Sequence, residues 1–288
     1  MAFNPKRFLT EPPAAPADWA RKMPVEDLPV ISRTAYVLED LREFEEQVEL
    51  QMLDDLIAAD PLMTAKLFGF TSKQRSKDTD GEAESVRQAL LLLGTAPFFR
   101  ALGSQLAVED LLAGEPEALN GFHQTLDRAR RAGRSAGAFA CQRDDPDAAL
   151  VHQAAVLYSL PELVVWLRAP ALALEVARRR ESDPGADQET LQKSVLNATY
   201  GEIRLELLKA WRLPRQIAQL ISGQAGLVSS PQAHIVRLAL KAAQPDQPNW
   251  ESAALGTLVR EIGDFLQLGL QHTRTLMKNL EQPEVSPL

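Results

Sequence analysis

We predict an all-α protein from three observations on the 288-residue sequence. First, apolar residues recur at the i, i+3, i+4, i+7 spacing of a single helix face at Val86, Ala89, Leu90 and Leu93. Second, the sequence contains no convincing run of the alternating apolar and polar residues that is typical of a strand. Third, β-branched residues stand singly among alanine, leucine, glutamate and arginine, which favour helices.

The first helix boundaries follow from local signals along the chain. Residues 1–22 are rich in proline and alanine and lack periodicity, so we expect a disordered or irregular tail. Asp60 and Ser230 each precede a proline, an arrangement that caps the first turn of a helix. The polar segment 71–84 contains Asp-Thr-Asp-Gly and predicts a loop. Apolar residues at helical spacing predict one helix of about four turns over residues 196–211.

Glycine and proline mark further helix ends. Gly94 follows the apolar face of residues 86–93 and predicts a C-terminal cap. The segment 181–187 contains Ser-Asp-Pro-Gly and predicts a break between two helices. Leu213-Pro214 resembles the start of a helix. Residues 112–120 are rich in acidic and small residues and contain Gly114 and Pro116, so we place the boundary between two lobes there. We expect an N-terminal helical lobe over 23–114 and a second lobe over 115–288.

Composition narrows the classes of function. A net charge of -8 and a pI near 5.2 argue against general affinity for the nucleic-acid backbone, so we expect no nucleic-acid partner. The single Cys141 excludes an intrachain disulfide and a multi-cysteine zinc site, which favours a reducing compartment. We find no signal peptide, and the apolar run at residues 89–99 is too short to span a bilayer. We therefore expect a cytoplasmic protein without a membrane partner.

Three sequence blocks, taken in order, are similar to those of a known family. They are Leu56-Ile-Ala-Ala-Asp-Pro-Leu-Met-Thr-Ala-Lys-Leu67, Ser85-Val-Arg-Gln-Ala-Leu-Leu-Leu-Leu-Gly94 and Leu207-Leu-Lys-Ala-Trp-Arg-Leu-Pro214. Together they resemble the HDOD family, a group of bacterial signal-output relatives of the HD-superfamily phosphohydrolases. The resemblance spans roughly residues 25–245. It implies an N-terminal helical bundle lobe packed on an HD-like helical lobe.

The resemblance also locates a metal site that the sequence does not preserve. Active HD proteins hold divalent ions with histidine and aspartate, and these ions activate water. The corresponding positions here carry other residues: Gln124, Tyr158, Ser159, Tyr200, Gln224 and Leu240. The chain has only four histidines, and none is paired with another at the spacing of metal ligands. We expect no catalytic residue, metal or cofactor, and we expect Tyr158 to line the former site with Gln124 and Tyr200 near it.

A group of arginines has two interpretations. Arg130, Arg131 and Arg134 lie on one predicted helix and form a candidate anion-binding site. The alternative is a solvated helix face with intrahelical pairs, such as Asp127 with Arg131.

Three functions follow from these expectations. The first is a non-catalytic bacterial signal-transduction module that binds protein partners in trans, with self-association left open. The second is a sensor that binds a nucleotide or cyclic dinucleotide in the vacated cavity. The third is a residual metal-dependent phosphodiesterase, which needs ligands that the sequence does not supply.

Overall fold

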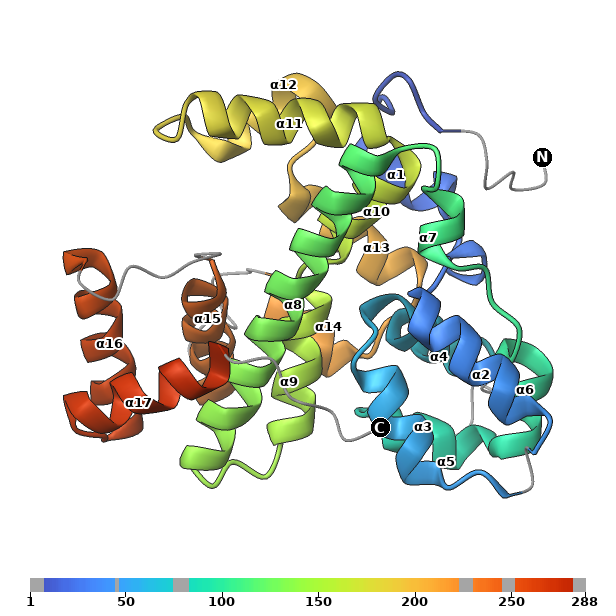
Figure 1. Cartoon of the computed structure of the whole chain (residues 1–288), viewed down its shortest axis with the longest axis horizontal. Helices are drawn as coiled ribbons and strands as arrows, with labels where there is room; N and C mark the ends of the chain where they lie inside the picture. The colour runs from blue at the N-terminus through green and yellow to red at the C-terminus, as the bar shows by residue number, and fades with distance from the viewer. Residues whose placement is uncertain (1–7, 45–46, 75–82, 223–229, 245–251, 282–288) are drawn as a thin grey trace. The chain divides into compact units, whose positions relative to one another are not determined.

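The computed structural model describes residues 8–44, 47–74, 83–222, 230–244 and 252–281. Within these ranges the regular elements are helices, and apart from an isolated bridge between Val30 and Ala107 no strand forms (Figure 1). The all-α prediction is confirmed. The elements are α1 (Pro16–Lys22), the 3-10 helix η1 (Val25–Asp27), α2 (Ser32–Arg42), α3 (Leu50–Ala58), α4 (Pro61–Gln74), α5 (Val86–Leu93), α6 (Thr95–Leu102), α7 (Val108–Leu111), α8 (Pro116–Gln142), α9 (Ala148–Leu157), α10 (Leu160–Arg168), α11 (Pro170–Ser182), α12 (Gln188–Leu196), α13 (Tyr200–Ala210), α14 (Arg215–Ile221), α15 (Pro231–Ala243), α16 (Ala253–Leu266) and α17 (Leu270–Glu281).

The chain forms two compact units. Unit 1 comprises residues 1–126 and 157–218, and unit 2 comprises residues 127–156 and 219–288. The chain passes from unit 1 to unit 2 inside α8, a continuous helix of 27 residues. This division differs from the lobes expected over 23–114 and 115–288, because the join expected near Gly114 lies inside unit 1.

In unit 1, the N-terminal segment packs into the core. The tail expected over residues 1–22 contains helix α1, which lies against α13. Trp19 of α1 is fully buried, and its indole Nε1 donates to the Leu196 carbonyl at 3.3 Å. The expectation of an irregular tail is therefore wrong for this part. A helix of seven residues is too short for its apolar face to appear as periodicity.

Asp60 connects two helices of unit 1. Its carboxylate is fully buried and accepts three backbone N–H groups, those of Leu62 at 2.9 Å, Met63 at 3.1 Å and Ile31 at 3.0 Å. The first two bonds cap α4, as the Asp-Pro pair predicts, and the third holds the residue that precedes α2. Burial raises the pKa of Asp60, and these hydrogen bonds oppose that change.

Two other boundary predictions have opposite outcomes. Gly94 ends α5 with φ of 81°, in the left-handed region that glycine adopts without strain, as expected. The single helix predicted over residues 196–211 is wrong. Asn197 ends α12 with φ of 58°, and the Thr199 hydroxyl caps a new helix by accepting from the Glu202 N–H at 3.0 Å. Local capping therefore overrides an apolar spacing that continues across the break.

In unit 2, arginines from α8 and the residue after it bind the C-terminal ends of three helices. Arg131 donates to the Ala243 carbonyl of α15 at 3.2 Å, and Arg134 donates to the Leu280 carbonyl of α17 at 3.3 Å. Arg143 donates to the Phe265 carbonyl of α16 at 2.6 Å. Each guanidinium satisfies carbonyl groups that a helix end leaves without a partner and complements the negative end of the helix dipole.

The segment Ala148–Arg168, which joins α9 and α10, is long and apolar enough to cross a membrane. However, 72% of its most apolar window is buried inside the protein. Core helices of globular proteins have the same length and composition, so this segment is weak evidence for a membrane span.

We expect opposite effects from two Gly→Ala substitutions in helices. A Cβ at Gly121 would collide with the ring of Trp166, so Gly121→Ala should lower the free energy of unfolding by about 1–3 kcal/mol. Gly256 in α16 has no heavy atom within 4 Å of an added Cβ. Gly256→Ala should therefore raise stability by about 0.5–1 kcal/mol through helix propensity. Urea unfolding measures both, and stabilisation by Gly121→Ala would contradict the packing of Trp166 on α8.

Candidate functional site

The residues at the expected positions of the His-Asp pair lie in unit 1, immediately before α10. Helix α9 ends at Leu157 and α10 begins at Leu160, so Tyr158 and Ser159 form the connection. Pro161 at the second position of α10 favours the new start, since it has no N–H to leave unsatisfied. Tyr158 is half-buried, and Ser159 is 9% exposed. This break fixes both side chains at one point of unit 1.

Arg204 fills the space beside Tyr158. Its guanidinium carbon lies 3.5 Å from the centroid of the Tyr158 ring, and its Nε donates to the Tyr158 carbonyl at 3.1 Å. The residue is only 8% exposed. Burial lowers the pKa of Arg204, contact with Tyr158 opposes this change, and arginine keeps its charge at neutral pH. A permanent cation therefore stacks on Tyr158, one of the two positions predicted for the lost His-Asp pair.

Sequence reasoning did not identify Arg204. Arg204 follows Tyr200 by four residues on α13, so both side chains lie on the same face of that helix. Tyr200 is half-buried, and its N–H donates to the Gln192 side chain at 2.8 Å. Helix α13 also carries Glu202, Glu206 and Lys209, so the sequence did not distinguish Arg204 as a buried charge.

The other predicted positions have different surroundings. Gln124 is exposed on α8 in unit 1, whereas Leu240 is half-buried on α15 in unit 2. Gln224 lies outside the described residues. That all of these positions once shared a single site stays a prediction.

The histidines of the described chain occupy separate places. His123 Nε2 lies 3.7 Å from Glu109 Oε1 in unit 1. His234 stacks on Phe265 in unit 2 with ring centroids 4.4 Å apart, and burial together with Arg237 lowers its pKa. Across the described ranges, no three His, Cys, Asp or Glu side chains gather as metal ligands would. Tyr158 and Ser159 are poor ligands for a divalent ion, and the Arg204 guanidinium stacked on Tyr158 would repel one.

The candidate anion-binding arginines lie in unit 2. Arg131 and Arg134 bind the helix carbonyls described above, and Arg130 is half-buried on the same helix. These contacts give Arg131 and Arg134 a structural role, and anion binding by the group stays a prediction.

The stacked pair yields a stability prediction. Arg204→Met and Tyr158→Leu should each destabilise unit 1, and the double variant should lose less than the sum. We expect a coupling energy of about 1–2 kcal/mol from a double-mutant cycle in urea unfolding, because the cation and the ring are largely shielded from water. Tyr158→Phe is the matched control, since it keeps the ring. A coupling energy close to zero would mean that the two side chains are merely neighbours.

Comparison with known proteins agrees with this architecture. This chain is similar to a solved structure of the MmoQ response regulator from Methylococcus capsulatus, with 21% sequence identity and a TM-score of 0.66. The match covers 91% of this chain and 100% of the MmoQ chain. A virulence factor from Campylobacter jejuni shares 17% identity and a TM-score of 0.62, over 92% of this chain and 97% of its own. No curated protein matches. The HDOD domain profile matches residues 28–226, more than half of the sequence. This chain therefore belongs to the HDOD domain family.

Proposed function

We propose that this chain is a non-catalytic signal-transduction module that acts through contacts with protein partners in trans. The observation that carries the proposal is the Arg204 guanidinium on the Tyr158 ring. Hydrolysis of a phosphoester by an HD scaffold needs divalent ions to activate water and to neutralise developing charge. Tyrosine and serine in place of the His-Asp pair, with a buried cation beside them, make this environment unfavourable for such ions.

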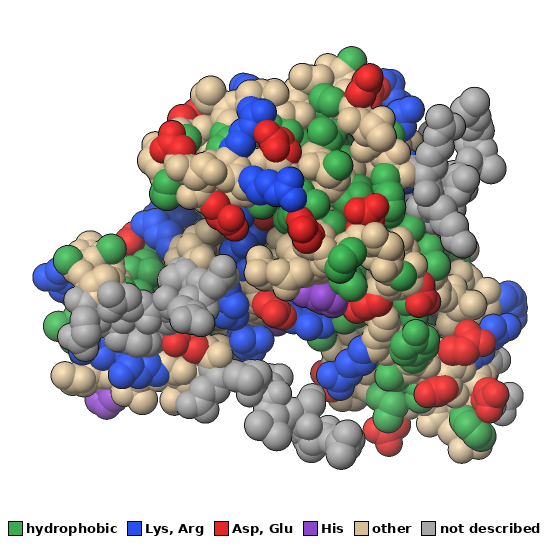
Figure 2. Space-filling view, turned by 45° about the horizontal axis from the view of Figure 1, so that its top comes forward, with side chains coloured by type: hydrophobic (Ala, Val, Ile, Leu, Met, Phe, Trp, Pro, Cys, Tyr) green, Lys and Arg blue, Asp and Glu red, His purple; other side chains and the backbone are tan. Residues whose placement is uncertain are grey.

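Family and fold support a signalling role. The chain belongs to the HDOD family, and the fold relative MmoQ is named as a response regulator. The acidic net charge of -8 and the single cysteine suit a protein of the reducing cytoplasm that binds neither nucleic acid nor membrane. On the face drawn in Figure 2, acidic and basic side chains are interspersed, and apolar side chains are exposed in several places among them.

Exposed apolar residues on two helices of unit 1 support contacts with proteins. Met52 on α3 is 51% exposed, and Leu91 and Leu92 on α5 are each 64% exposed. Helices α3 and α5 pack against each other, so these side chains belong to one part of the unit. Large apolar side chains that remain in water on adjacent elements are typical of protein-binding surfaces.

The catalytic part of the proposal is tested on protein purified without chelator or histidine tag. We expect substoichiometric manganese, iron and zinc by mass spectrometry, and no turnover of bis-(4-nitrophenyl) phosphate above the blank. An active HD phosphohydrolase serves as the positive control, and Ser159→Ala as the matched variant. Bound metal with turnover that Ser159→Ala abolishes would restore the enzyme interpretation. Turnover that Ser159→Ala leaves unchanged would indicate a contaminating hydrolase.

The partner-binding part is tested with a photo-crosslinking amino acid at Leu92, or at the exposed Arg180 of α11 as the control. We expect a discrete crosslinked species in cells of the source organism from position 92 and none from position 180. Leu91→Ser should weaken the crosslink, because it removes adjacent apolar surface. A second copy of this chain as the crosslinked species would demonstrate self-association, whereas equal labelling at both positions would contradict a surface on α5.

A nucleotide or cyclic-dinucleotide sensor is the second candidate, since Arg204 is a buried cation beside a former ligand position. Its guanidinium already stacks on Tyr158 and binds the Tyr158 carbonyl, so a phosphate would have to displace these contacts. Calorimetric titration with cyclic di-GMP separates the two candidates. Saturable binding that Arg204→Lys weakens would favour the sensor.

A further inference from the structure

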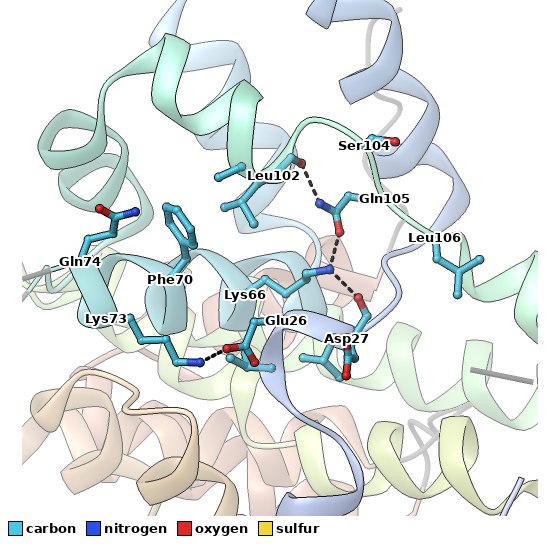
Figure 3. A pocket seen from close by; sticks show the side chains of 13 residues that line it. Glu26, Asp27, Lys66, Phe70, Lys73, Gln74, Leu102, Ser104, Gln105 and Leu106 are labelled. Atoms are coloured by element: carbon cyan, nitrogen blue, oxygen red, sulfur yellow. Dashed lines mark hydrogen bonds and ion pairs between the residues drawn. The ribbon is translucent and has the colours of Figure 1, made fainter. Parts of the chain in front are cut away.

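A cavity of about 820 Å³ lies in unit 1. Neither Tyr158 nor Arg204 is among the residues that line it. It is bounded by η1, by α4 and by the segment 101–106, where α6 ends (Figure 3). Its volume falls within the range of pockets that bind small molecules. None of the functions considered above uses this cavity.

Lys66 of α4 places a buried ammonium at this cavity. The residue is 6% exposed, and its Nζ donates to the Leu28 carbonyl at 2.7 Å and to the side-chain oxygen of Gln105 (Figure 3). The Gln105 amide nitrogen in turn donates to the Leu102 carbonyl at 2.8 Å, which keeps the amide oxygen directed at Lys66. An ammonium carries three N–H donors, and these two neutral oxygens accept only two of them.

In the described part of the chain, no carboxylate contacts the Lys66 ammonium. Among the described residues, Lys66 forms no ion pair, and Asp27 and Asp60 act on it only at longer range. Burial dominates and lowers the pKa of Lys66 to about 8, so the side chain remains largely protonated at neutral pH. A buried charge that meets only neutral acceptors is costly, and an anion that accepts the third N–H would reduce that cost.

The remaining walls indicate what kind of anion fits. Phe70, Leu102 and Leu106 line the cavity with apolar surface (Figure 3). At the rim, Lys73 is paired with Glu26. A phosphate would call for several donors around its oxygens, whereas this cavity has one buried ammonium and much apolar wall.

We propose that the cavity binds a small monocarboxylic acid, with its carboxylate on Lys66 and its apolar body against Phe70, Leu102 and Leu106. This proposal does not depend on the proposed loss of catalysis, so an experiment can contradict one of the two proposals and leave the other standing.

Octanoate is the probe, with octanamide as the matched neutral compound. We expect saturable calorimetric binding of octanoate to the full chain with a Kd of about 0.1–1 mM. Octanamide should bind at least about tenfold more weakly, because it has the same body without the charge. Equal affinity for the two compounds, or no saturable binding of octanoate, would overturn the proposal.

Two variants locate the site. Lys66→Met keeps an apolar chain of similar length without the charge, and should reduce octanoate affinity by at least about tenfold. Lys209→Met removes an exposed lysine from α13 and should leave affinity within about twofold. Undiminished binding by folded Lys66→Met, shown to be folded by its thermal transition, would overturn the assignment.

Should Lys66→Met fail to fold, the pH dependence of the wild type replaces it. Below about pH 8 Lys66 is protonated and pairs with the carboxylate, and above that pH the amine becomes neutral. Affinity should therefore fall by up to roughly tenfold for each pH unit above about 8. The other charged groups around the cavity are Glu26, Asp27, Asp60 and Lys73. The binding of octanamide, measured over the same pH range, controls for changes in the cavity that do not act through the charge of the ligand. An octanoate affinity that stays constant would overturn the proposal.

Discussion

The stacking of Arg204 on Tyr158 constrains what the HD-like part of this chain can do. A guanidinium buried in unit 1 needs compensation, and here an aromatic face and a backbone carbonyl supply it. The helix break at Tyr158 and Ser159 presents the ring and the carbonyl together, and α13 presents the arginine one turn after Tyr200. The same arrangement places a fixed positive charge beside Tyr158 and Ser159, the positions at which we propose that metal ligands were lost.

Buried polar groups also organise the rest of each unit. In unit 1, the Asp60 carboxylate accepts three backbone N–H groups and so fixes the start of α4 relative to the residue before α2. In unit 2, Arg131, Arg134 and Arg143 hold the ends of three helices through their carbonyl groups. In both units, side-chain charges meet the backbone groups that helix ends leave unsatisfied. Lys66 differs from these arginines in its burial, because it is 6% exposed whereas Arg131 and Arg134 are half-buried and Arg143 is exposed.

Local sequence signals predicted much of the fold. The Asp60-Pro61 cap, the Ser230 cap and the glycine end at Gly94 all appear as expected, since each depends on neighbouring residues alone. The break at Asn197 was missed, because apolar spacing continues across it while the caps decide the boundary. Arg204 and Lys66 were not predicted either. Their roles depend on which residues the tertiary fold brings beside them, and sequence spacing does not contain that information.

The most direct test of the proposed loss of the metal site is an anomalous diffraction map from crystals soaked in manganese chloride. The stacked guanidinium and the poor ligands around it predict no anomalous peak near the Tyr158 hydroxyl or the Ser159 hydroxyl. They also predict that the Arg204 side chain stays on the Tyr158 ring. A manganese peak within coordination distance of either hydroxyl, with Arg204 displaced from the ring, would contradict the account.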